Sequence, residues 1–162
     1  FEVPSSNKSS NIESQQTIPV EKMKESQIGN FVDLKIVAIK DAGNEKIIKY
    51  EDGSTYTGQV RGNMKHGHGV LQDKFGNLYD GEFRNDKREG YGVFRTAEGS
   101  VYKGPWKDDL QDGLGEEQWS DGSTYKGGYS QGMKQGRGTY VWDDGTRYVG
   151  EFVSNLMEGT VA

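Results

Sequence analysis

The sequence predicts an all-β protein, an elongated single-layer twisted antiparallel sheet of successive β-hairpins with a mostly irregular N-terminal arm. Three observations predict this fold. A glycine recurs every 23 residues without insertion, at Gly53, Gly76, Gly99, Gly122 and Gly145. A tyrosine follows each of these glycines by three residues, and another glycine follows by five. Side-chain character in these stretches alternates with a period of two, which is the periodicity of a β-strand.

Composition agrees with a repeat array. Only 31% of the 162 residues are hydrophobic and 24 are glycine, which is a poor composition for a two-layer core. A repeat unit needs to bury surface only against its neighbours. The chain has no cysteine and a net charge of −5, so we expect no disulfide, no thiolate metal site and no nucleic-acid partner.

We expect three regions along the chain. Residues 1–29 are polar and predict a flexible or partner-bound N-terminal arm, because they can bury little apolar area. Residues 30–52 read as a degenerate cap hairpin with two β-branched strands around a turn at 42–44. Residues 53–162 form the five-repeat domain. The chain begins at Phe1, which we interpret as a processed start or a fragment boundary.

Each repeat predicts one hairpin. Alternation places Tyr56, Gly58 and Val60 on one face of a first strand. The same argument places Gly69 and Leu71 on one face of a second strand. Residues 61–66 between them are polar and are predicted to be a turn. Asp-Gly pairs such as 52–53 and 121–122 predict tight turns between the units, because glycine tolerates a positive φ.

The strand glycines predict a packing arrangement. Glycine leaves no side chain to pack in a strand, but it lets an aromatic ring lie flat over the bare backbone of the neighbouring strand. We therefore expect tyrosine rings to cover glycines of adjacent strands, and the sheet to curve into a trough with one aromatic wall.

The unit resembles a known repeat. Residues 121–140, D-G-S-T-Y-K-G-G-Y-S-Q-G-M-K-Q-G-R-G-T-Y, are similar to the membrane occupation and recognition nexus (MORN) repeat. The resemblance covers residues 53–162 and extends weakly to 30–52. It implies an array of the kind found in cytoskeletal and ciliary scaffolds, in junctional proteins that tether membranes, and beside the catalytic domains of lipid kinases and a histone methyltransferase. Val161 replaces the last repeated glycine, so the final hairpin is expected to be incomplete or paired with another chain.

No catalytic constellation is visible in the sequence. His66 and His68 have no cysteine or further histidine to complete a metal site. The Asp-Asp pairs lack the alternating oxygen ligands of a calcium loop. The G-x-G pairs follow the strand pattern and do not open a helix. We therefore expect no enzyme activity, no cofactor and no metal.

The predicted partner-binding site is the concave aromatic groove. Tyr and Trp are frequent in interface hot spots, and an amphipathic helix or an extended peptide fits a groove of this kind. The alternative is that these aromatic rings bind no partner and serve only as the packed core of the sheet. The residues assigned to the groove are Tyr56, Tyr79, Phe83, Tyr102, Trp106, Tyr125, Tyr129, Tyr148 and Phe152.

A second candidate surface is a basic rim that could face anionic lipid. Clustered Lys and Arg side chains attract such a membrane at about 1 kcal/mol each, although acidic residues of the third repeat interrupt the rim. The residues assigned to it are Arg61, Lys65, Arg84, Lys87 and Arg88.

The function that the sequence favours is a non-catalytic scaffold or adaptor in a larger cytoskeletal, ciliary or membrane-associated assembly. One alternative is a phospholipid-binding or membrane-tethering module. Another is the regulatory repeat domain of an enzyme whose catalytic part is absent. We expect a cytoplasmic protein associated with cytoskeleton or membrane, with organelle import after N-terminal processing as the alternative.

Overall fold

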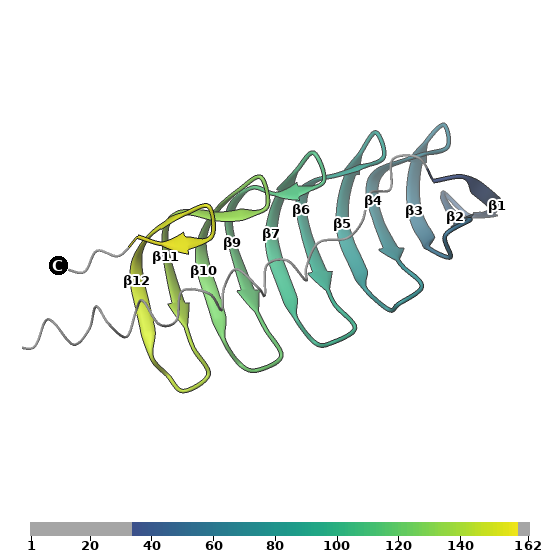
Figure 1. Ribbon diagram of the computed structural model, residues 1–162. Helices are drawn as coiled ribbons and strands as arrows, with labels where there is room; N and C mark the ends of the chain where they lie inside the picture. Colours follow the sequence, from purple (N-terminus) through teal and green to yellow (C-terminus); the bar gives the residue numbers. More distant parts are fainter. Residues whose placement is uncertain (1–33, 159–162) are drawn as a thin grey trace, which may run out of the picture.

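The structure is a computed structural model that describes residues 34–158. Within these residues the chain forms one open antiparallel sheet of successive hairpins, which confirms the predicted fold class (Figure 1). The predicted arm at 1–29 and the irregular position Val161 lie outside the described residues.

The sheet has 13 strands within residues 34–158. They are β1 (Ile36–Ala42), β2 (Glu45–Tyr50), β3 (Thr55–Arg61), β4 (Met64–Gln72), β5 (Leu78–Arg84), β6 (Lys87–Arg95), β7 (Val101–Lys107), β8 (Leu110–Gln111), β9 (Gly113–Gln118), β10 (Thr124–Ser130), β11 (Met133–Val141), β12 (Arg147–Val153) and β13 (Leu156–Met157). Each pairs with the strands next to it in sequence, except that β8 pairs only with β7, and β9 continues from β7 to β10. Figure 1 shows the result as a long ladder of curved hairpins with β1 at one end and β12 at the other.

The hairpin turns are shorter than predicted. The sequence predicted a turn over 61–66, but β3 ends at Arg61 and β4 begins at Met64. Gly62 takes a φ of 65°, and the equivalent turn of the next repeat holds Asn85 and Asp86 at 48° and 73°. Two-residue turns with positive φ match the twist of paired strands, and Asn and Asp tolerate this conformation. The strands therefore extend closer to the tips than the polarity of the residues indicated.

The Asp-Gly turns between repeats are confirmed. Gly53 and Gly122 have φ values of 94° and 96°. In the first of these turns the Asp52 carboxylate accepts hydrogen bonds from the backbone N–H and the hydroxyl of Ser54, at 2.9 and 2.6 Å. These bonds hold the chain in position to start β3.

Tyrosine rings cover the strand glycines as predicted. A Cβ added at Gly69 would collide with the Tyr56 ring, and one added at Gly138 would lie 2.5 Å from the Tyr125 hydroxyl oxygen. The Tyr125 hydroxyl donates to the Gly128 carbonyl at 2.8 Å. Ring and hydroxyl together fix the two strands of a hairpin at close range.

The buried side chains form one ladder, on what we call the core face of the sheet. Neighbouring rings meet edge to face, with Phe83 lying 5.2 Å from Tyr56 and 5.0 Å from Tyr79 between ring centroids. Trp106 continues the ladder at 5.2 Å from Tyr79 and 5.3 Å from Tyr102. Such contacts add about 0.5–1.5 kcal/mol per pair to area burial, so consecutive repeats are coupled through their rings.

The described part of residues 30–52 is the β1–β2 hairpin. Ile48 and Tyr50 of β2 are buried, whereas every residue of β1 is exposed. The turn between the two strands contains Gly43 at a φ of 73°. The hairpin matches the strand–turn–strand reading of this region, and its assignment as a separate cap remains a prediction.

Candidate functional site

All nine residues assigned to the aromatic groove are buried, with 0–5% of their surface exposed. They pack against one another and against glycine backbone, so in this structure they build the core of the array. Partner binding at these rings remains a prediction.

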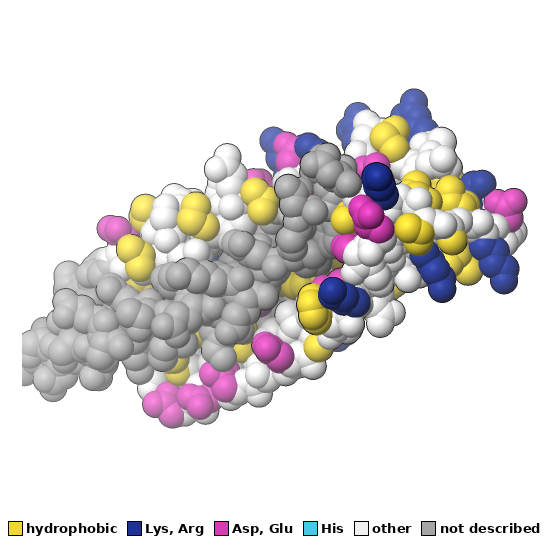
Figure 2. Space-filling model, turned by 45° about the vertical axis from the view of Figure 1, so that its right-hand side comes forward, with side chains coloured by type: hydrophobic (Ala, Val, Ile, Leu, Met, Phe, Trp, Pro, Cys, Tyr) yellow, Lys and Arg dark blue, Asp and Glu magenta, His cyan; other side chains and the backbone are white. Residues whose placement is uncertain are grey.

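Two of the five basic rim residues do not face outward. Arg61, Arg84 and Lys87 are exposed, but Lys65 and Arg88 are only 2% and 4% exposed. Because β4 and β6 extend to the tips, strand alternation turns Lys65 and Arg88 toward the core face. Their assignment to a lipid-facing rim was therefore wrong. On the face drawn in Figure 2, the Lys and Arg side chains that can be seen lie toward the β1 end of the molecule.

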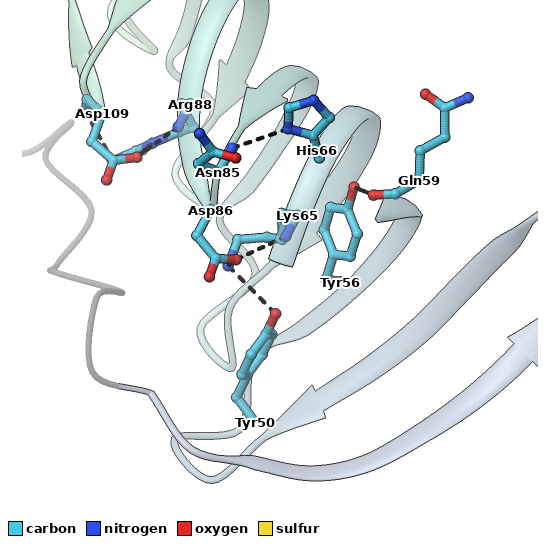
Figure 3. Close-up of polar contacts among 9 residues, drawn as sticks. All are labelled: Tyr50, Tyr56, Gln59, Lys65, His66, Asn85, Asp86, Arg88 and Asp109. Atoms are coloured by element: carbon cyan, nitrogen blue, oxygen red, sulfur yellow. Dashed lines mark hydrogen bonds and ion pairs between the residues drawn. The ribbon is translucent and has the colours of Figure 1, made fainter. Parts of the chain in front are cut away.

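Lys65 lies in a site made by two neighbouring repeats (Figure 3). Its Nζ is 3.2 Å from the Asp86 carboxylate and 3.4 Å from the Tyr50 hydroxyl. The same Asp86 oxygen accepts a 2.8 Å hydrogen bond from the Lys65 backbone N–H. The Nζ also lies 4.9 Å from the centroid of the Tyr50 ring. A buried cation is tolerated when it is paired and hydrogen-bonded in this way.

Arg88 repeats the arrangement 23 residues later. Its backbone N–H and Nε donate to the Asp109 carboxylate at 2.8 and 3.1 Å, and Nη2 donates to the Asp109 carbonyl at 3.0 Å. The guanidinium carbon lies 4.7 Å from the Trp106 ring centroid. Burial lowers the pKa of Arg88, and the charge of Asp109 acts in the opposite direction.

Lys134 occupies the same repeat position but lacks the pairing. It is 0% exposed, and its Nζ has no hydrogen-bond partner among residues 34–158. Its backbone N–H donates at 2.8 Å to Asn155, which stands where the other two sites have aspartate. The Nζ lies 4.9 Å from the Trp119 centroid and 5.2 Å from that of Tyr125. Burial lowers the pKa of Lys134 to about 8, and Glu117 opposes this shift.

Glu117 is the acidic group that acts on Lys134. It is 3% exposed and accepts a 2.7 Å hydrogen bond from the Tyr129 hydroxyl. Burial raises the pKa of Glu117, while Lys134 and the bond from Tyr129 lower it. Burial also raises the pKa of Tyr129, and the charge of Glu117 adds to that shift.

The repeat matches a known family. Comparison with protein families matches the MORN repeat at residues 56–74, 79–101, 102–124, 125–147 and 148–160. The chain belongs to the MORN repeat family. A comparison with curated proteins finds no match. MORN repeats are generally non-catalytic and are associated with membrane or cytoskeleton.

Within residues 34–158 of this MORN array, no three His, Cys, Asp or Glu side chains come together in a way that could hold a metal ion. The described residues also contain no helix long and apolar enough to cross a membrane.

Sequence reasoning missed a set of buried polar atoms on the core face of the MORN array. In the part of the chain that the structure describes, six side chains carry a buried nitrogen or oxygen with no hydrogen-bond partner: Gln111, Trp119, Ser123, Lys134, Tyr140 and Trp142. All lie in the second half of the described chain. The 23-residue spacing of Lys65, Arg88, Gln111 and Lys134 was present in the sequence. This spacing could have shown that the four residues share one inward-facing position of the repeat. Their hydrogen-bond partners could be identified only from the pairing of the strands.

Proposed function

We propose that this MORN array is a non-catalytic adaptor that binds a helical segment of a protein partner along the hairpin tips. The observation that carries the proposal is a row of exposed apolar side chains at one repeat position, on the face opposite the core face. The row consists of Met64, Leu110, Met133 and Leu156, which are 39%, 39%, 37% and 48% exposed.

The position of the row follows from strand alternation. Met64 immediately precedes the buried Lys65, and Met133 immediately precedes the buried Lys134. Their side chains therefore point away from the core face. Apolar residues that recur at one exposed position of a repeat array lie in a line along it, and exposed apolar surface of this kind favours an interaction surface.

The spacing of the row fits an α-helix. Successive repeats are two strands apart, or about 10 Å. Seven residues of an α-helix also rise about 10 Å. A helix with an apolar residue at every seventh position would therefore contact successive repeats in register. In the second repeat the row position is the exposed Lys87, which favours an acidic residue at the matching position of the partner.

The test is quantitative affinity purification with a variant in which all four row residues are replaced by serine. These side chains are partly exposed, so the variant is expected to fold, which circular dichroism checks. We expect at least one protein to be recovered ~10-fold less with this variant than with the wild type. A ~10-fold loss corresponds to about 1.4 kcal/mol of binding free energy.

The matched control replaces two other exposed residues of the same outer face, Tyr91→Ser and Leu114→Ser, which are 57% and 80% exposed in the wild type. This control is expected to recover the partner fully. If every recovered protein binds the row variant as well as the wild type, the proposal is wrong.

A further inference from the structure

A second repeated position lies beside the row of apolar tips. The last residue of the first strand of each hairpin pairs directly with the row position across the two-residue turn, as Arg61 pairs with Met64 in the first repeat. Side chains of directly opposed residues project from the same face of a sheet, about 5 Å apart. A second line of side chains therefore runs along the tips, parallel to the apolar row, and we call it the flanking row. Its members, all exposed, are Arg61, Arg84, Lys107, Ser130 and Val153.

The flanking row changes its charge along the array. It is cationic in the first three repeats, at Arg61, Arg84 and Lys107, and uncharged in the last two. Lys87 adds a fourth exposed cation, because it takes the place of the apolar residue in the second repeat. Among the residues that the structure describes, none of these four cations takes part in an ion pair. Their charges are therefore available to a partner.

Most of the acidic side chains at the same three tips are already bound. Asp86 and Asp109 pair with the buried Lys65 and Arg88. Asp108 is exposed and lowers the positive charge of the third tip. The three tips still carry more exposed cations than exposed acids, so the charge that they favour in a partner is negative.

A hollow of about 310 Å³ lies between the tips of the second and third repeats. Arg84 and Lys87 line it together with Asn85, Glu89 and Asp108. The Glu89 carboxylate accepts a 3.2 Å hydrogen bond from the backbone N–H of Asp108, so it is engaged within the protein. An acidic side chain that enters this hollow would meet two cations, and the arginine can bind a carboxylate through two parallel hydrogen bonds.

We propose that the partner helix is acidic along the edge that faces the flanking row of the first three repeats, and uncharged where it crosses the last two. This inference rests on the proposed adaptor function and names the chemistry of its partner. One repeat and seven helical residues both span about 10 Å. The acidic residues therefore recur every seven positions beside the apolar ones, in three consecutive heptads. The change in charge also determines which end of the helix lies over the first repeat.

The test uses synthetic helical peptides of about 32 residues, long enough to cross five repeats. All carry leucine at every seventh position. Beside the leucines of three consecutive heptads, one peptide carries glutamate on both sides and a second carries lysine. Fluorescence anisotropy measures their affinities. We expect the wild type to bind the glutamate peptide ~10-fold more tightly than the lysine peptide in ~0.1 M salt, and the difference to shrink as the salt concentration rises.

Reversing the charges of the flanking row is expected to reverse this preference. The variant combines Arg61→Glu, Arg84→Glu and Lys107→Glu, and it should bind the lysine peptide ~10-fold more tightly than the glutamate peptide. These side chains are exposed, so the variant is expected to fold, which circular dichroism checks.

The matched control makes the same change of net charge at three other exposed positions of the outer face. It combines Lys103→Glu, Lys126→Glu and Arg137→Glu, on β7, β10 and β11. This control should keep the preference of the wild type for the glutamate peptide. An equal reversal in the control would show that net charge, and not the flanking row, selects the peptide, and would overturn the proposal.

Two further results would overturn it. The first is that the wild type fails to bind the glutamate peptide, or binds both peptides equally. The second is that the flanking-row variant keeps the preference of the wild type but loses binding to vesicles of phosphatidylcholine and phosphatidylserine, since the cations would then face a membrane. The adaptor function is judged separately, by the loss of partner with the serine variant of the apolar row. Partner loss with that variant beside equal binding of the two peptides would contradict only the acidic edge.

Discussion

The two halves of the sheet share a backbone but differ in how their buried polar groups are paired. In the part of the sheet up to Asp109, which we call the first half, Lys65 and Arg88 bind Asp86 and Asp109, and Trp106 donates to a backbone carbonyl. In the part from Gln111 onward, which we call the second half, six buried side chains each carry a polar atom without a hydrogen-bond partner within the described chain. The same tyrosine-on-glycine packing recurs in both halves. Glycine and tyrosine thus determine the fold, while the other inward positions are free to differ between repeats.

Tyrosine-on-glycine packing is expected to contribute equally in both halves. Gly69→Ala and Gly138→Ala would each push a methyl group into a tyrosine ring. Each is expected to lower the free energy of unfolding by about 3 kcal/mol, the upper end of the usual cost of added volume in a packed core, because the methyl group meets a ring that is itself buried. Urea denaturation measures both variants.

Gly136→Ala is the control, because it adds a methyl group into open space at a φ of 85°. It should cost only about 1–2 kcal/mol of left-handed backbone strain. A mild effect of Gly138→Ala beside a severe effect of Gly69→Ala would show that the halves differ in backbone packing as well.

Replacing the buried cation is expected to destabilise the fold at Arg88 but not at Lys134. Arg88→Met leaves the Asp109 carboxylate, whose side chain is 22% exposed, without its cation, and should destabilise the fold by about 3 kcal/mol. The double variant Lys134→Met with Glu117→Gln removes a buried acid and an unpaired cation together. It should leave stability unchanged or raise it by about 1 kcal/mol.

Lys103→Met, at an exposed position of β7, should stay within about 0.5 kcal/mol of the wild type. The free energy of unfolding in urea decides among these variants. A loss of stability in the double variant equal to that of Arg88→Met would remove the distinction between the halves.

The pH dependence of the free energy of unfolding is expected to reveal the contribution of Lys134. Burial lowers the pKa of Lys134 from 10.5 to about 8, so the unfolded chain binds more protons than the folded chain between these values. Stability therefore rises with pH from about 8 upward, by on the order of 2 kcal/mol. Above pH 10 the buried tyrosines, whose pKa values are raised, oppose this trend.

Urea denaturation at pH 8, 9 and 10 measures the rise, and Lys134→Met should abolish it. An equal rise in both proteins would show that Lys134 is not its source.

Most of the fold could be predicted from local sequence. The recurrence of Tyr56 and Gly58 identified the strands, and the Asp-Gly pairs identified the turns between repeats. The hairpin tips were predicted too long because residues 61–66 are polar, although β3 ends at Arg61 and β4 begins at Met64. Because of that error Lys65 was assigned to the surface, since the alternation of inward and outward side chains along the strand was not extended into the hairpin tip.

The buried cation site could not be predicted, because it depends on pairing between repeats. Asp86 and Asn155 are ordinary turn residues in the sequence. Only the structure shows that the side chain of each accepts a hydrogen bond from the backbone N–H of the residue 21 positions earlier. The structure also shows what the difference between the two residue types does: Asp86 binds the side chain of Lys65, whereas Asn155 binds only the backbone N–H of Lys134.

A double-mutant cycle between Lys134 and Asn155 tests the central claim most directly. Asn155→Asp is introduced into the wild type and into Lys134→Met, and the free energies of unfolding of the four proteins are measured in urea at pH 7. We predict a favourable coupling of at least ~1 kcal/mol between the new carboxylate and Lys134. A coupling within about 0.3 kcal/mol of zero would contradict the claim that asparagine at position 155 deprives Lys134 of the carboxylate that Asp86 and Asp109 supply at the other two sites.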